Sequence, residues 1–112
     1  MGETLKIIDC KEDYKFQGPR YIRLGPESGE EFRDSYFIPW LKENKGKSNL
    51  KVDFEGTIVY TPSFLEETFG GAIRAGYPEV KNLEFINIKE EEKKRTLGYI
   101  AAAIEKLEKG GK

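Results

Sequence analysis

The sequence predicts an α/β domain in which a small, mostly parallel sheet carries helices mainly on one face. Strand-like segments with alternating apolar and polar residues, such as 50–54, are separated by segments whose apolar residues have helical spacing. A helix between two strands requires a crossover connection, so the strands on either side of it run parallel. The predicted order is β-β-α-β-α-β-α, and the first two strands are expected to form an antiparallel hairpin.

Composition narrows the class of protein. A chain of 112 residues fits one domain, 1–112, with a frayed tail at 110–112. Its 19 basic and 20 acidic residues give a formal net charge of −1, so charge does not favour nucleic acid or an acidic membrane as a partner. We expect neither a membrane span nor a signal peptide. The lone Cys10 fits a reducing compartment, and we expect a cytoplasmic protein.

Two segments near the N-terminus are the predicted hairpin strands. Leu5 and Ile7 share one face of the segment 4–9, and Ile22 and Leu24 share one face of the segment 20–24. Glycine–proline pairs at 18–19 and 25–26 bound the second segment.

The first helix is expected to begin at Ser28. The sequence S-G-E-E has the spacing of a capping box, with Glu31 three residues after the serine. Pro39 is expected to kink or divide this helix near Phe37. Its apolar stripe comprises Phe32, Tyr36, Phe37, Trp40 and Leu41.

The most informative stretch is 52–74, which indicates a strand followed by a second helix. The β-branched and aromatic residues 57–60 extend or follow the strand. Thr61 can act as the N-cap, with Pro62 at the first helical position. Alternatively, Ser63 caps the helix and Glu66 closes a capping box. The apolar stripe comprises Phe64, Leu65, Thr68, Phe69, Ala72 and Ile73.

The opposite face of this second helix is expected to point outward. It carries Ser63, Glu67, Gly70 and Arg74, with Glu66 beside them. An exposed glycine inside a helix costs about 1 kcal/mol relative to alanine, so either the position is merely tolerant or another molecule lies against it. Gly71, at the edge of the stripe, is expected to let the helix approach the sheet closely.

The remaining elements complete the predicted order. Gly76 and Pro78 end the second helix. A strand is expected at 83–88 and a final helix at 90–109, where four apolar residues recur every three or four positions: Leu97, Ile100, Ile104 and Leu107.

Two motifs carry a family resemblance over about residues 20–88. V-D-F-E-G at 52–56 followed by S-F-L-E-E-T-F-G-G at 63–71, together with S-G-E-E-F-R-D at 28–34, resembles the STAS-like domain of unknown function found in bacteria, archaea and their mobile elements. That group is similar to the STAS domains of anti-sigma-factor antagonists. The resemblance implies a small sheet with helices mainly on one face. It also implies a non-catalytic regulatory protein that contacts a protein partner, such as a serine-kinase-like ATPase or a related regulator.

The resemblance also bears on phosphorylation. The antagonists carry a phosphorylatable serine at the start of the helix after the central strand, and that position falls on Pro62 here. Ser63 and Thr61 are the neighbouring candidate phosphoacceptors, and both hydroxyls can instead be helix caps. The expected partner surface comprises Thr61, Ser63, Glu66, Glu67, Gly70 and Arg74.

Two further residues are candidate supports for this site. Arg33 either pairs with Glu30 one turn earlier, the preferred interpretation, or orients a loop near the start of the second helix. Asp53 lies on the polar face of the central strand. With no histidine, no phosphate-binding loop and no carboxylate spacing that stands out, we expect no cofactor and no metal. The alternatives are a small enzyme or nucleotide-binding protein that uses Asp53, Arg33 and the second helix start, and an accessory or inhibitor protein of a mobile element.

Overall fold

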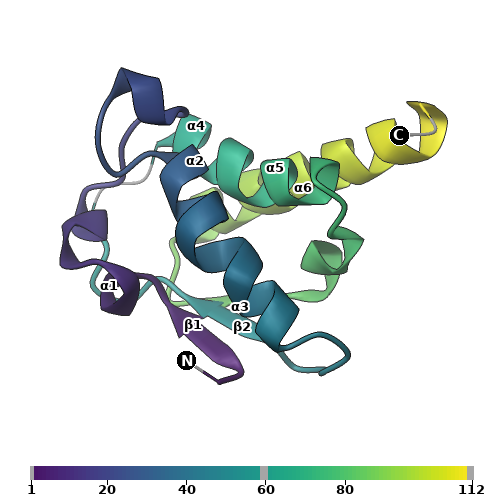
Figure 1. Ribbon diagram of the computed structural model, residues 1–112, viewed down its shortest axis with the longest axis horizontal. Helices are drawn as coiled ribbons and strands as arrows, with labels where there is room; N and C mark the ends of the chain where they lie inside the picture. Colours follow the sequence, from purple (N-terminus) through teal and green to yellow (C-terminus); the bar gives the residue numbers. More distant parts are fainter. Residues whose placement is uncertain (1, 59–60, 111–112) are drawn as a thin grey trace.

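The computed structural model describes residues 2–58 and 61–110, and within them it contains one parallel three-stranded sheet (Figure 1). The strands are β1 (Thr4–Lys6), β2 (Lys51–Asp53) and β3 (Glu84–Ile86), in the spatial order β1-β2-β3. Leu5, Val52 and Phe85 lie side by side in register, and all three are buried. One face of the sheet therefore contributes to the core, whereas alternate residues on the other face are more exposed.

Two long helices connect these strands. The first long helix consists of α2 (Gly29–Phe32), η3 (Arg33–Phe37) and α3 (Ile38–Glu43), and joins β1 to β2. The second long helix consists of α4 (Pro62–Leu65), η4 (Glu66–Gly70) and α5 (Gly71–Arg74), and joins β2 to β3. Right-handed crossovers that move across a sheet in one direction place their helices on the same face. Figure 1 shows these helices gathered on one side of the sheet.

The N-terminal hairpin is a wrong prediction. The strand β1 ends at Lys6 and runs into α1 (Ile7–Cys10), which is followed by η1 (Glu12–Lys15). The segment 20–24 holds η2 (Ile22–Leu24) rather than a strand. The carbonyl groups of Pro19 and Arg20 accept hydrogen bonds from the Gly29 and Glu30 amides at the start of α2. These carbonyl groups are therefore not available for pairing with another strand. The observed order of the main elements is therefore β-α-β-α-β-α.

The first long helix is not divided at Pro39. It runs through the proline inside α3, and the widened turn of η3 lies immediately before that segment. Both long helices contain such a π-helical segment, η3 in the first and η4 in the second.

The last helix, α6 (Glu90–Gly110), covers part of the second long helix. It packs along η4 and α5, and Ile100 and Ala103 are its buried apolar contacts. The short η5 (Pro78–Asn82) precedes β3 and also contacts α6. The second long helix is therefore covered by more than the sheet, which its own periodicity does not reveal.

Two expectations fall partly outside the described residues. Val59 and Tyr60, in the expected strand extension 57–60, are not described, and neither are residues 111 and 112 of the expected frayed tail. Gly110 is the last residue of α6. Among the described residues, no helix combines the length and the apolar character that a membrane crossing requires.

The predicted apolar stripe of the second long helix is confirmed, because all six of its residues are fully buried. Phe69 lies at its centre. The centroid of its ring lies 5.0 Å from that of Phe37 and 5.0 Å from that of Phe85, both in edge-on geometry. A ring with edge-on contacts to a helix and to a strand joins the helical layer to the sheet.

Replacement of this ring should therefore unfold much of the protein. Phe69→Ala should cost about 3–5 kcal/mol, a large part of the about 5–15 kcal/mol that stabilises a typical domain. Urea denaturation followed by circular dichroism measures the loss. Leu97→Ala, at an exposed position on α6, is the control, and equal stability of the two variants would contradict this account of the core.

Candidate functional site

The two sequence motifs meet where the first and second long helices cross. Ser28 caps the first helix, since its hydroxyl accepts a hydrogen bond from the Glu31 amide at 3.0 Å. A Cβ atom at Gly29 would lie 2.7 Å from the Phe64 carbonyl oxygen and 3.1 Å from its Cα. The hydroxyl of Thr68 donates to the Gly29 carbonyl at 3.3 Å. Gly29 therefore lets the two backbones come into contact.

The capping box is only half formed. The Glu31 carboxylate accepts hydrogen bonds from the Tyr14 hydroxyl at 3.0 Å and from the Lys11 ammonium at 3.2 Å, instead of turning back to the helix start. Burial, and next the hydrogen bond to Glu31, raise the pKa of Tyr14. Glu31 thus ties the N-terminal segment to the first long helix.

Arg33 forms the ion pair at the centre of this crossing. Its guanidinium donates to the Glu67 carboxylate of the second long helix and, through Nε at 2.8 Å, to Asp34. The preferred pairing with Glu30 is wrong, because the Glu30 carboxylate accepts from the Ile22 amide instead. The Arg33 side chain is 15% exposed and that of Glu67 is 10% exposed, so both charges are largely removed from water.

Two more arginines extend this pair into a network. Arg20, from the loop before α2, donates to both Glu66 and Glu67. Arg74, the last residue of α5, donates to Glu66 at 2.7 Å. Burial alone would raise the pKa of the Glu66 carboxyl, but the hydrogen bonds from Arg74 and Arg20 outweigh it and lower that pKa. The network holds Glu66 ionised and anchors the loop that carries Arg20 to the second long helix.

The expectation that Glu67 and Gly70 point outward is wrong. Both are buried, because Arg33, Arg20 and Arg74 fold over this face. Gly70 is an ordinary helical residue, and a Cβ there would lie 2.8 Å from a Glu66 carboxylate oxygen. Gly70 therefore lies beneath the Glu66 and Arg74 side chains of its own helix and not at an open surface.

Gly71 also has a different role from the one expected. A Cβ at this position would lie 2.7 Å from an Arg33 guanidinium nitrogen, and not against the sheet. The glycine provides room for the arginine that pairs with Glu67.

The start of the second long helix follows the first of the two predicted arrangements. Thr61 is the N-cap: its hydroxyl accepts from the Phe64 amide at 3.0 Å and donates to the Gly18 carbonyl at 2.7 Å. Ser63 lies in the first turn of the helix, and among the described residues its hydroxyl forms no hydrogen bond. Of the two candidate phosphoacceptors, only Thr61 is held by contacts on both sides.

Asp53 does not join this cluster. Its carboxylate accepts from the Glu55 amide and from the Asn87 side chain, both at 2.9 Å, and so it links the ends of β2 and β3. The described residues contain no group of three or more metal-binding side chains. Burial, and to a smaller extent Asp9, raise the pKa of the Cys10 thiol to about 11, which suppresses its thiolate. Asp53 therefore stabilises the ends of two strands, away from the charged network at the helix crossing.

Exposed apolar side chains gather near the start of this second helix. Four are more than half exposed and form what we call the apolar patch: Phe16, Ile22, Leu24 and Ile58, at 55–58%. The Ile58 amide donates to the Lys15 carbonyl at 2.8 Å, which brings Ile58 beside Phe16. Ile22 and Leu24 lie on the loop that Arg20 anchors to Glu66. Phe16 and Ile58 therefore lie beside each other, and Ile22 and Leu24 lie on a loop that is tied to the first turns of the second long helix.

Sequence reasoning found most members of the charged network but missed two important residues. Arg20 was placed in a strand, and no local pattern links it to Glu66, 46 positions away. Gly29, the second residue of the S-G-E-E motif, has no role of its own in the capping box that the sequence predicts. The feature of the sequence that could have indicated this close approach is the glycine within S-G-E-E, because only glycine leaves room for another backbone there.

The comparison with protein families agrees with this arrangement. The family model described as a STAS-like domain of unknown function matches residues 28–93, more than half of the chain. The chain belongs to this family. No curated protein and no solved structure matches the chain significantly. The match begins at the Ser28 cap and includes both halves of the helix crossing.

Alanine at the two helical glycines Gly29 and Gly98 should have opposite effects. Gly29→Ala should destabilise the fold by at least about 1 kcal/mol, because its Cβ meets backbone atoms that cannot move away cheaply. Gly98→Ala, inside α6, should stabilise it by up to about 1 kcal/mol, because nothing lies within 4 Å of its Cβ and alanine is the better helix former. Chemical denaturation checks both, and stabilisation by Gly29→Ala would refute the close crossing.

Proposed function

We propose that this chain is a non-catalytic regulatory protein that acts by contact with a protein partner. The observation that carries this proposal is the apolar patch around the start of the second long helix. Large apolar side chains that are exposed near one another on a small domain mark interaction sites, because water solvates them poorly. The charged residues of the same helix are engaged internally, so the apolar side chains are the groups that remain for a partner.

The surface of this proposal includes the helix residues expected from the sequence. Arg74 is exposed, and Ser63 and Glu66 are partly exposed. Thr61, Glu67 and Gly70 support the surface from beneath, because they hold the helix start and the crossing in place. The apolar patch supplies anchoring area, and these polar groups supply its rim.

Ser63 is the phosphoacceptor that we favour. A phosphate on its hydroxyl would lie in the first turn of a helix, where free amides and the positive end of the dipole stabilise negative charge. Thr61 would lose its bonds to the Phe64 amide and the Gly18 carbonyl if it were modified. The resemblance to anti-sigma-factor antagonists supports a serine-kinase-like ATPase or a related regulator as the partner.

A comparison of surface variants in the source cell tests this function. Affinity-tagged wild type should recover a defined protein partner, and Ile22→Ser/Leu24→Ser should reduce that recovery at least about tenfold, as expected when apolar anchors are lost. Leu97→Ser is the matched control, because it also removes an exposed leucine but lies on α6, outside the patch. Quantitative mass spectrometry measures recovery, and melting temperatures establish that all variants fold.

Equal recovery by the patch variant and wild type would contradict the proposal. A panel of nucleotides and divalent metals in a thermal-shift assay distinguishes the enzyme alternative, for which one of them should raise the melting temperature of wild type. If the partner belongs to a mobile element and its activity stops on binding, the inhibitor alternative is favoured.

A further inference from the structure

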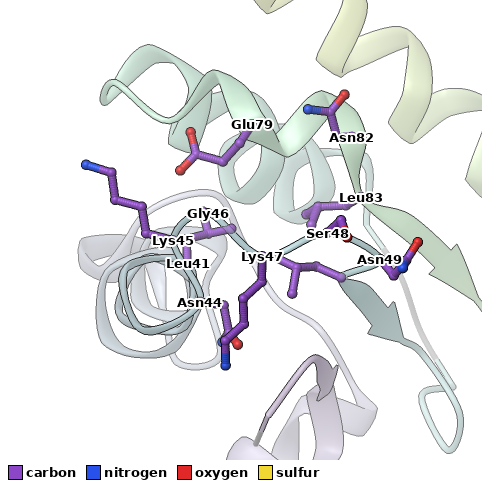
Figure 2. Close-up of a pocket in the computed structure, with 11 residues that line it drawn as sticks. Leu41, Asn44, Lys45, Gly46, Lys47, Ser48, Asn49, Glu79, Asn82 and Leu83 are labelled. Carbon is purple, nitrogen blue, oxygen red and sulfur yellow. The ribbon is translucent and has the colours of Figure 1, made fainter.

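A pocket lies at the N-terminal ends of β2 and β3 (Figure 2). The second long helix starts from the other end of the sheet, after the C-terminal end of β2. The end of α3, the loop 44–50 and η5 line this pocket. Its volume is about 440 Å³, which is within the range of small-molecule sites.

The floor of this pocket is apolar and fixed in place. Leu41 of α3, Leu50 before β2 and Leu83 before β3 form it, and each is at most 8% exposed. The Glu84 amide donates to the Leu50 carbonyl at 3.0 Å and ties together the two chain segments that form the walls. An apolar group of a ligand would therefore meet a preformed surface that belongs to the core.

The rim carries charges of both signs, one from the loop and one from η5. Figure 2 shows Glu79 and Asn82 on η5, facing the loop residues 45–49 across the pocket. In Figure 2, the side chain of Lys45 extends from the loop into the same part of the view as the Glu79 carboxylate. The side chain of Lys47 points away from η5. No ion pair among the described residues involves Lys45 or Glu79. Lys45 and Glu79 are therefore charges of opposite sign, on the loop and on η5, that a ligand could pair with, whereas Lys47 is directed away from η5.

We propose that this pocket binds a small zwitterion with an apolar side chain, of the class of free aliphatic α-amino acids. Its carboxylate would meet Lys45 and its ammonium would meet Glu79, while its side chain lies on the leucine floor. A simple anion would leave Glu79 beside it without a partner, and a simple cation would do the same to Lys45. Only a ligand with both charges complements both sides of the rim. This site is separate from the proposed partner surface.

Four probes separate the three contributions by heteronuclear NMR titration of the whole chain. L-leucine carries both charges and an apolar side chain, whereas isocaproate lacks the ammonium, isoamylamine lacks the carboxylate and glycine lacks the side chain. L-leucine at millimolar concentration should shift the amide signals of residues 44–50 and 79–83. Each of the other probes should bind at least about tenfold more weakly, because each loses one of the three contacts.

Charge-removing variants then assign the rim. Lys45→Gln and Glu79→Gln should each weaken L-leucine binding about tenfold, and Glu79→Gln should leave isocaproate binding unchanged. Lys47→Gln is the matched control in the same loop and should bind L-leucine like wild type. These side chains lie on the surface or half-buried, and melting temperatures verify that the variants fold. The proposal is overturned if L-leucine shifts no signal in these segments, if isocaproate binds as tightly, or if Lys45→Gln and Glu79→Gln bind like wild type.

Discussion

The ion pair between Arg33 and Glu67 is the interaction on which the arrangement of the two long helices depends. Both charges are largely removed from water, and a charge in that position is destabilising unless its partner and its hydrogen bonds are in place. Glycines on the two sides make the geometry possible. Gly29 lets the backbones cross closely, and Gly71 leaves room for the guanidinium. The pair therefore fixes how the helices cross and is itself fixed by that crossing.

The same network determines which surface remains for other molecules. Glu67 also accepts from Arg20, so the crossing anchors the loop that carries Ile22 and Leu24. Because Glu66 and Glu67 are already paired within the chain, a partner that used them would have to break those bonds first. Within the part of the chain that the structure describes, the exposed side chains of the apolar patch take part in no such ion pair, and the proposed function therefore relies on them.

Sequence reasoning succeeded where one element determines its own geometry. The stripe that contains Phe69 and the caps at Ser28 and Thr61 follow from helical spacing and from local side-chain chemistry, and the structure confirms them. The predictions from sequence were wrong where contacts with a distant segment of the chain determine the structure. The alternation of Ile22 and Leu24 resembles a strand, but within the described residues no strand pairs with this segment, which forms η2 instead. The outward position expected for Gly70 was wrong because periodicity cannot show that arginine side chains fold over that face. The predicted site therefore included several residues of the observed charged network, but Glu67 and Gly70 are buried and not exposed as expected.

A double-mutant cycle on Arg33 and Glu67 tests the central claim most directly. Arg33→Met, Glu67→Gln and the double variant are compared with wild type by urea denaturation, and the coupling free energy is calculated from the four stabilities. If the pair organises the crossing, each single variant should be destabilised and the coupling should exceed about 1 kcal/mol, since interacting neighbours couple by about 0.5–3 kcal/mol. Additive effects, within the about 0.3–0.5 kcal/mol expected of independent sites, would contradict the claim that this ion pair holds the two helices together.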